Sequence, residues 1–229
     1  MLLHGGWTTI GITFGALLPA LAASRRVIAV EQQGPGPAAG LNRPLSFPQM
    51  ADDTAALLRH LGVAQADFFG HSDGGNVGLG IALRHPALVR KLVVAGTHYH
   101  NDGLVPGLLE SYKAVGPDDA DMQRLKDAYC QVAPRPEDWP TLVGKVVQLA
   151  LAFPGWPPDE LAAIRAPVLT VIGDADNVRP EHAVALFRLM PHSQLAVLPG
   201  TDHRLPKQRA EWLLLMLTDF LAAPTPPAT

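Results

Sequence analysis

The chain has 229 residues, of which 48% are hydrophobic, so it can bury one large core, and one main domain is expected. Its formal net charge of -3 at pH 7 comes from charges that are scattered along the chain. Without a basic stripe or an acidic block, the sequence argues against nucleic-acid partners and favours a small-molecule substrate.

An apolar stretch at residues 10–24 resembles the core and cleavage site of a secretory signal. No lysine or arginine precedes it, and Arg25 and Arg26 follow it, which is the wrong order for export. The stretch is also too short and too rich in glycine to span a bilayer. We therefore interpret it as a loop and a buried helix at 10–23, and we expect a cytoplasmic protein that does not associate with a membrane.

Short apolar runs rich in Val, Ile and Leu alternate with segments of helical period, which is typical of an α/β fold whose mostly parallel sheet has helices on both faces. Strands are predicted at residues 1–5, 26–32, 66–71, 91–97, 167–173 and 193–200. Helices are predicted at residues 10–23, 46–62, 75–86, 179–191 and 209–222. The helix at 46–62 has the clearest ends, because Ser46 is a good N-cap and Gly62 is a good stop.

Residues 100–158 break this alternation, since they contain only helical patterns and many prolines between two predicted strands. Such a segment needs an apolar surface to fold against, which favours an α-helical lid inserted after the fourth predicted strand. A peripheral insertion without a gating role is the alternative. The predicted organisation is a core of 1–99 and 159–223, a helical lid of 100–158 and a disordered, proline-rich tail of 224–229. Cys130, the single cysteine, excludes an intramolecular disulfide, and its helical surroundings predict a packing role.

The motif GHSDG at residues 70–74 matches GxSxG, and an apolar strand before it and a helix after it give the context that this motif requires. On a sharp turn from strand to helix only glycine fits at the flanking positions, and the serine Oγ is pushed out above the sheet. Ser72 would then lie at a helix N-terminus, where N–H groups favour an oxyanion. Because glycine and serine are also common in ordinary turns, the motif alone leaves both interpretations open.

Three features elsewhere favour a nucleophile. VLPGTDHRL places His203 after a predicted strand, where it can act as a base. VIGDADNV ends another strand with Asp174 and Asp176, which can orient an imidazole. LLHGGW ends the first strand with glycines whose backbone can present an oxyanion donor. Each has an ordinary structural explanation by itself, but together, in the order serine, acid, histidine, they predict a catalytic site.

These motifs, with RVIAVEQQGPG, ALRHPALVRKLVVAGT and IRAPVLTVIGDAD, resemble the α/β-hydrolase superfamily, specifically its lid-bearing serine esterase and lactonase type, over nearly the whole chain. The resemblance implies that Ser72 is the nucleophile, Asp176 the acid and His203 the base. Asp174 is then a turn residue.

The resemblance also implies an oxyanion hole. The first donor is the backbone N–H of Gly6, with Trp7 as the alternative, and the second is the N–H of Asp73. The given sequence begins at the strand that carries HGGW, without the family's usual first two strands, and both a real shortening and a missing N-terminal piece would explain this. An exposed sheet edge would result, which could pair with another subunit in a homodimer.

Candidate substrate-binding residues are aromatic side chains that could line an apolar pocket under the lid, together with residues beside the catalytic motifs or after a strand. They are Trp7, His71, His98, Tyr99, Trp139, Phe153 and Trp156. The aromatic residues in the lid could equally be lid packing. Asp73 and Asp202 flank the catalytic serine and histidine and should repel carboxylate substrates, which favours neutral esters of small to medium size.

His98, His100 and Asp102 resemble the HxHxD start of a binuclear metal site. The final histidine of that motif is missing and no other ligand cluster appears, so we expect no metal and no organic cofactor.

The sequence therefore predicts a serine hydrolase that cleaves small to medium carboxylic esters through an acyl-enzyme. Lactone opening, C–C bond hydrolysis and perhydrolysis on the same triad remain open. The non-enzymatic alternative is a binding protein on a hydrolase scaffold, which predicts that at least one triad position is lost.

Overall fold

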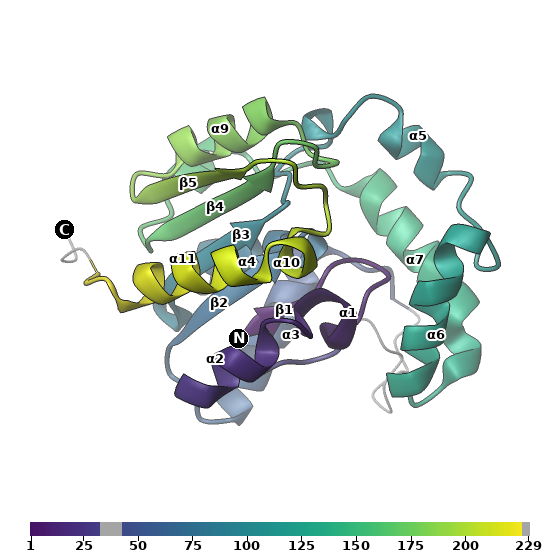
Figure 1. Ribbon diagram of the computed structural model, residues 1–229, viewed down its shortest axis with the longest axis horizontal. Coiled ribbons are helices and arrows are strands. Elements are labelled where there is room, and N and C mark those ends of the chain that lie inside the picture. The colour runs from purple at the N-terminus through teal and green to yellow at the C-terminus, as the bar shows by residue number, and fades with distance from the viewer. Residues whose placement is uncertain (33–42, 226–229) are drawn as a thin grey trace.

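A parallel sheet forms the centre of the molecule (Figure 1). The structure is a computed structural model that describes residues 1–32 and 43–225. Its five-stranded sheet follows chain order: β1 (Leu2–Leu3), β2 (Ala66–His71), β3 (Val89–Ala95), β4 (Val168–Gly173) and β5 (Ser193–Leu198). The predicted parallel α/β fold is confirmed, and the strand predicted at 66–71 has the predicted bounds. Pairing of the β1 edge with another subunit stays a prediction.

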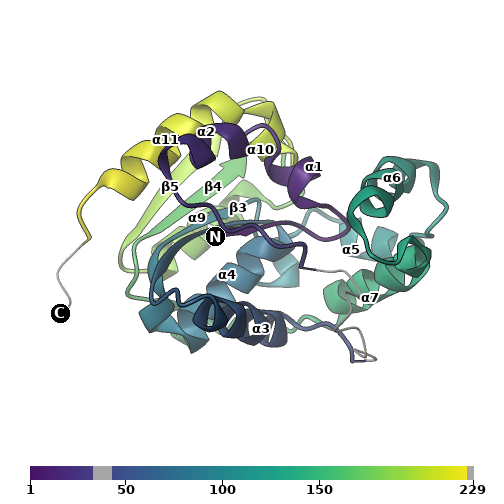
Figure 2. The same cartoon turned by 90° about the horizontal axis from the view of Figure 1, so that it is seen from below.

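Helices cover both faces of the sheet, with α3 and α4 on one side and α2 and α11 on the other (Figure 2). The first layer contains α3 (Phe47–His60), α4 (Asp73–Arg84), α8 (Pro158–Ala162) and α9 (Pro180–Leu189). The second contains α1 (Ile10–Phe14), α2 (Leu18–Ser24), α10 (Leu205–Gln208) and α11 (Ala210–Ala222). Successive strand residues face opposite layers, as Phe68 and Phe69 do. Because both faces are covered, β4 is buried along its whole length and is apolar except for Thr170.

Residues 100–158 form a separate group of helices at one end of the sheet (Figure 1). They contain α5 (Leu108–Tyr112), α6 (Gln123–Val132) and α7 (Trp139–Ala152), with the short 3₁₀ turns η2 (Asn101–Gly103), η3 (Ala120–Met122) and η4 (Pro136–Asp138). Trp139 and Tyr129 lie in their small apolar core, against which Trp7 packs. The role of this group as a lid stays a prediction. Cys130 is exposed, so the predicted packing role is wrong.

Two predicted elements differ in the structure. The strand at 26–32 is reduced to a single bridge between Leu2 and Ala29, because its neighbour β1 is only two residues long. The helix at 10–23 is broken into α1 and α2 near Gly15. Pro19 lies in the first turn of α2, where its missing N–H costs no hydrogen bond, whereas inside one continuous helix it would.

The predicted ends of α3 are present, since the Ser46 side chain accepts a hydrogen bond from the N–H of Gln49 and Gly62 has a φ of 68°. A further 3₁₀ turn, η1 (Pro86–Leu88), joins α4 to β3.

Within residues 1–32 and 43–225, no helix is both long and apolar enough to cross a membrane. Of the predicted disordered tail, residues 226–229 lie outside the described part of the chain.

Candidate active site

Ser72 lies in the sharp turn between β2 and α4. Its φ of 54° and ψ of -122° are outside the regions that side-chain-bearing residues prefer, and such a conformation costs about 1–3 kcal/mol. The N–H of Ser72 donates to the carbonyl oxygen of Ala95, 2.8 Å away, which fixes the turn to β3. Among the described residues only one other non-glycine residue, Trp7, has a positive φ. The turn therefore holds Ser72 in the strained conformation that exposes its Oγ.

The glycines on either side of Ser72 are needed for steric reasons. A Cβ on Gly70 would lie 2.3 Å from the carbonyl oxygen of Gly74, and a Cβ on Gly74 would lie 2.0 Å from that of Leu3. Both obstacles are backbone atoms, so no side-chain movement can relieve the contact. The close approach of α4 to β1 thus depends on Gly74.

We expect Gly74→Ala to lower the free energy of unfolding by about 3 kcal/mol or more, since the sheet or α4 must shift to admit the methyl group. Gly144→Ala, in the middle of α7, is the matched control because a Cβ there meets no atom within 4 Å. It should be neutral or stabilising by up to about 1 kcal/mol. Urea unfolding followed by circular dichroism measures both. Equal stability of the Gly74→Ala protein and the wild type would contradict the steric argument.

His203 and Asp176 reach Ser72 from the loops that follow β5 and β4. The Nε2 of His203 is 3.0 Å from the Oγ of Ser72, and its Nδ1 is 2.7 Å from the Oδ1 of Asp176. The same carboxylate oxygen accepts the N–H of Val178 at 3.1 Å. Asp174 is exposed, and its carboxylate accepts the N–H of Thr201. The structure thus brings together the three side chains that the sequence assigned to a triad, and it places Asp174 outside them.

The interaction between His203 and Asp176 opposes the effect of burial on the pKa of each residue. Burial by itself lowers the pKa of the His203 imidazole, but the hydrogen bond and the charge of Asp176 outweigh it and hold the pKa above the usual histidine value. Burial by itself raises the pKa of Asp176, but the hydrogen bond and charge of His203 outweigh it and hold the pKa below its usual value. Asp176 is therefore ionised at neutral pH and stabilises a proton on His203.

The two residues whose N–H groups the sequence assigned to an oxyanion hole lie against each other, since a Cβ on Gly6 would lie 2.4 Å from the Oδ2 of Asp73. The N–H groups of Gly6 and Asp73 meet no acceptor among the residues that the structure describes. Gly5 packs against Ser72, since a Cβ on Gly5 would lie 3.1 Å from the Ser72 Cβ. A turn closed by the Thr8 N–H and the Gly5 carbonyl contains Gly6 and Trp7, and the φ of Trp7 is 57°. This strained turn sets the backbone of Gly6 beside Asp73, and the oxyanion hole itself stays a prediction.

His71, which precedes the serine, supports the histidine loop. Its Nε2–H donates to the carbonyl oxygen of His203, 2.8 Å away. Burial, followed by the nearby His203, lowers the pKa of His71 to about 3, so its ring is neutral and holds the proton on Nε2. Its Nδ1 is buried without a partner among the described residues. His71 is thus a positioning residue for the base.

A cavity of about 250 Å³ opens in front of Ser72 and His203. Its lining combines residues from the sheet ends with residues from the helices of 100–158. It consists of Gly5, Gly6, Trp7, Thr8, Phe47, His71, Ser72, Asp73, His98, Leu104, Leu108, Tyr112, Leu125, Val146, Ala150, Asn177, Val178 and His203. Of the predicted substrate-binding residues, Trp7, His71 and His98 lie in this lining. Tyr112, Phe47 and the aliphatic residues were missed, because the pattern of a helix does not show which neighbour its apolar face meets.

The other predicted substrate-binding residues lie outside this cavity. Tyr99 stacks on His182 with ring centroids 4.2 Å apart. The indole N–H of Trp139 donates to the carbonyl oxygen of Pro117 at 2.8 Å, within the core of the 100–158 helices. Contacts with residues that are distant in the sequence set these positions, a stacked ring for Tyr99 and a hydrogen bond for Trp139.

Trp156 and Phe153 belong to the core beneath the cavity. The indole N–H of Trp156 donates to the Oδ1 of Asn76 in α4 at 3.0 Å. Phe153 packs edge-on against Phe47, which itself lines the cavity. Both residues therefore pack in the main core, whereas the predicted alternative of lid packing describes Trp139.

The HxHxD motif is divided between two environments. His98 lies in the cavity lining, where burial lowers its pKa to about 4, whereas His100 is exposed and bonds to Asp102 at 2.8 Å. Asp202 pairs with Arg204 and is not part of the lining. In the described part of the chain, no group of three or more His, Cys, Asp or Glu side chains could hold a metal ion.

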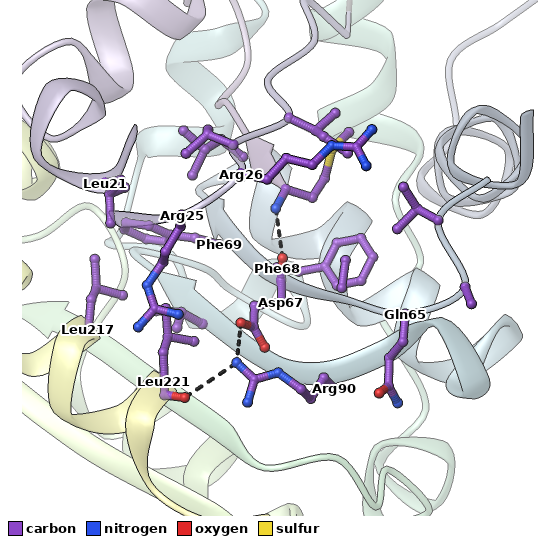
Figure 3. Close-up of a pocket in the computed structure, with 18 of the residues that line it drawn as sticks. Leu21, Arg25, Arg26, Gln65, Asp67, Phe68, Phe69, Arg90, Leu217 and Leu221 are labelled. Atoms are coloured by element: carbon purple, nitrogen blue, oxygen red, sulfur yellow. Dashed lines mark hydrogen bonds and ion pairs between the residues drawn. The ribbon is translucent and has the colours of Figure 1, made fainter. Parts of the chain in front are cut away.

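A larger cavity of about 480 Å³ lies at the opposite end of β2, near Asp67 (Figure 3). Phe68, Phe69 and Leu217 line it, and no triad residue does. Arg90 bonds to the Asp67 carboxylate and to a backbone carbonyl in α11, and the N-terminal ammonium donates to the Asp67 carbonyl. This cavity contains no nucleophile, so the candidate chemistry lies at the smaller one.

Comparisons with known proteins agree with this fold. A sequence model of the alpha/beta hydrolase family matches residues 1–214. The chain is 30% identical over 229 residues to 2-hydroxymuconate semialdehyde hydrolase of Pseudomonas sp. (strain CF600), covering 97% of this chain and 75% of that protein. It is 25% identical over 252 residues to the putative carbamate hydrolase RutD of Caulobacter sp. (strain K31), with 97% and 90% covered. Among solved structures, NosK from Streptomyces actuosus shares the fold with a TM-score of 0.76 and 21% identity, covering 96% of this chain and 95% of that one. The protein is therefore a hydrolase, and it belongs to the alpha/beta hydrolase family.

Proposed function

We propose that the protein hydrolyses small to medium carboxylic esters through a covalent acyl-enzyme on Ser72. The observation that carries this proposal is the unbroken chain of contacts from Ser72 Oγ to His203 at 3.0 Å and from His203 to Asp176 at 2.7 Å. A binding protein on the same scaffold would have no need for a strained serine that lines a cavity at the end of these contacts.

In the first half-reaction, His203 Nε2 takes the proton of the Ser72 hydroxyl as Oγ attacks the ester carbonyl carbon. The oxyanion accepts hydrogen bonds from the N–H groups of Gly6 and Asp73. When the tetrahedral intermediate collapses, the bond to the alcohol oxygen breaks and His203 gives that oxygen the proton.

In the second half-reaction, water replaces the alcohol. His203 takes a proton from water, the resulting hydroxide attacks the acyl carbon, and the proton returns to the Ser72 oxygen as the acid leaves. Asp176 stays ionised throughout and stabilises the imidazolium. The cycle needs no oxidant, reductant or second substrate besides water.

The size of the substrate follows from the cavity. A volume of about 250 Å³ is below the usual range of drug-sized ligand pockets, so short acyl and alcohol groups fit best. The lining is mostly apolar. Its charged residue is Asp73, and it also contains the titratable residues His71, His98 and His203. These properties support small esters, and they disfavour substrates with a free carboxylate.

The second candidate is hydrolysis of a C–C bond or a lactone on the same triad. It is supported by the 30% identity to 2-hydroxymuconate semialdehyde hydrolase, because the semialdehyde in that name is not an ester. Both candidates use Ser72 as the nucleophile or as a proton relay, so labelling or mutation of Ser72 does not distinguish them. The relative rates on a panel of esters, lactones and diketones at equal concentration do.

The experiment that tests the proposal is labelling with a fluorophosphonate, which reacts only with an activated serine. Mass spectrometry of the digested protein should show one labelled peptide that contains Ser72, and labelling should fall sharply in His203→Ala. Absence of label at Ser72 in the folded protein would favour the binding-protein alternative.

The pH dependence follows from His203, which acts as a base only when neutral. Because the pKa of His203 lies above the usual value of 6.5, kcat/KM for an uncharged ester should fall on the acid side with a midpoint above that value. Asp73, whose pKa is about 6, titrates below this limb. Initial rates on 4-nitrophenyl acetate in a constant-ionic-strength buffer series measure the midpoint. A rate that is unchanged down to about pH 5 would exclude His203 as the base.

A further inference from the structure

The carboxylate of Asp73 projects from the start of α4 into the cavity beside Ser72. In the described part of the chain its oxygens take part in no hydrogen bond and no ion pair, although the charge of His203 acts on the carboxylate and lowers its pKa. Burial raises its pKa to about 6, so at neutral pH it is mostly ionised in a place that disfavours charge. Asp73 is half-buried, and a carboxylate in such a place gains from a bound counter-charge.

The rest of the lining offers few cations, and His203 is the residue whose charge reaches Asp73. The lining contains no lysine and no arginine. Of the histidines in it, burial lowers the pKa of His71 to about 3 and that of His98 to about 4, so both are neutral at pH 7. His203 is committed to Asp176 and to the serine. The negative charge of Asp73 is therefore available to a ligand.

Two aromatic rings flank the same part of the cavity. Trp7 and Tyr112 meet edge to face, with ring centroids 5.2 Å apart and planes at 79°. The charge of Asp73, after burial, contributes to raising the pKa of Tyr112 to about 12, which places the phenol near the carboxylate. Aromatic faces attract organic cations, and the combination of a carboxylate with such rings is suited to an ammonium group.

The location of the charge makes a cation useful to the reaction. A Cβ on Gly6 would lie 2.4 Å from the Oδ2 of Asp73, so the carboxylate touches the backbone of a proposed oxyanion donor. A carboxylate in this place repels the negative charge that develops on the carbonyl oxygen. A cation bound to the carboxylate removes that repulsion during the reaction, so it should raise kcat as well as lower KM.

We propose that Asp73, Trp7 and Tyr112 form a cation subsite, and that the preferred substrates are small esters that carry an ammonium group near the scissile carbonyl. This inference rests on the proposed ester hydrolysis and names its substrate class. The neutral esters that the sequence favours are then slower substrates of the same site.

The test uses pairs of esters that differ only in charge. The acyl pair is 4-nitrophenyl 4-(trimethylammonio)butanoate and 4-nitrophenyl 5,5-dimethylhexanoate, in which carbon replaces the ammonium nitrogen. The alcohol pair is choline butanoate and 3,3-dimethylbutyl butanoate, followed by titration of released acid. In the wild type, kcat/KM for the cationic member of at least one pair should exceed that for the neutral member by about tenfold or more, after correction for the uncatalysed rates.

Variants separate the subsite from general electrostatics. Asp73→Asn should reduce the ratio of cationic to neutral kcat/KM to about one, whatever its absolute rates. Asp202→Asn removes a charge outside the cavity lining and should change the ratio less than about twofold. Tyr112→Leu should reduce the ratio, and Tyr112→Phe, which keeps the ring, should preserve it.

A binding measurement avoids turnover altogether. Tetramethylammonium should slow fluorophosphonate labelling of Ser72 in the wild type and have no effect in Asp73→Asn. If Ser72 is labelled and neutral esters are cleaved, but neither pair shows a preference for the cation, the subsite is wrong and ester hydrolysis stands. If no ester is cleaved and Ser72 stays unlabelled, the proposed function itself fails.

Discussion

Ser72→Ala should reduce kcat for a short 4-nitrophenyl ester by about 10⁴-fold or more, because it removes the only atom that can form the acyl-enzyme. The residual rate comes from substrate binding and from the N–H groups of Gly6 and Asp73, which remain in place. The fold should tolerate the change, since alanine has the same Cβ as serine in the strained turn. The loss of one hydrogen bond to His203 should change the free energy of unfolding by about 1 kcal/mol or less.

Stopped-flow release of 4-nitrophenol measures this loss, and differential scanning calorimetry of the same sample shows that the variant is folded. Ser193→Ala is the matched control, because Ser193 begins β5 and does not line the cavity. It should retain the wild-type rate. A folded Ser72→Ala protein whose kcat is within tenfold of the wild type would exclude the acyl-enzyme mechanism.

The parts of the fold that the sequence predicted well are those in which one local pattern determines the outcome. The strand at 66–71 is apolar, short and followed by a glycine turn, and it has the predicted bounds. The strand predicted at 26–32 does not form, and the reason is nonlocal. A strand exists only where a neighbour pairs with it, and β1 pairs with this segment through one bridge, between Leu2 and Ala29.

The candidate site shows the same difference between features that a local pattern determines and features that depend on distant contacts. The triad was predictable because each member follows a strand in a recognisable motif, and parallel strands bring their carboxyl ends to one edge of the sheet. The lining of the pocket was not predictable, because the helices of residues 100–158 supply much of it. The orientation of these helices depends on their packing, which the sequence pattern does not give. Trp139 and Trp156 are buried through indole hydrogen bonds to Pro117 and Asn76, whereas Tyr112 reaches the cavity.

Asp73 shows what the structure adds to a correct chemical expectation. The sequence predicted that its charge would bias the site against anions. In the structure the side chain lines the cavity, and within the described residues its oxygens take part in no hydrogen bond. The carboxylate is therefore free to bind a cation, and a bias against anions becomes a proposed preference for ammonium esters.

Asp176→Asn should lower kcat/KM by about 10²- to 10⁴-fold while leaving the geometry of the site nearly unchanged. Both donors, the Nδ1–H of His203 and the N–H of Val178, bond to the Oδ1 of Asp176. The Oδ2 is buried without a partner among the described residues. An asparagine oxygen in the Oδ1 position therefore keeps both hydrogen bonds, and the flipped amide is disfavoured because its NH₂ would face two donors. The loss is that of the negative charge that stabilises the imidazolium.

This loss of charge has a second, independent consequence. Without it, burial dominates the pKa of His203 and should move it downward, so the acid limb of the kcat/KM profile should shift to lower pH while the plateau falls. Rates measured between about pH 5 and pH 9 on an uncharged ester show both effects. Asp174→Asn is the control, because that exposed carboxylate bonds to the N–H of Thr201, and its profile should match the wild type. A lower plateau with an unmoved acid limb would mean that Asp176 acts by orienting His203 and not by its charge, whereas a shifted limb with a lower plateau assigns it the electrostatic role.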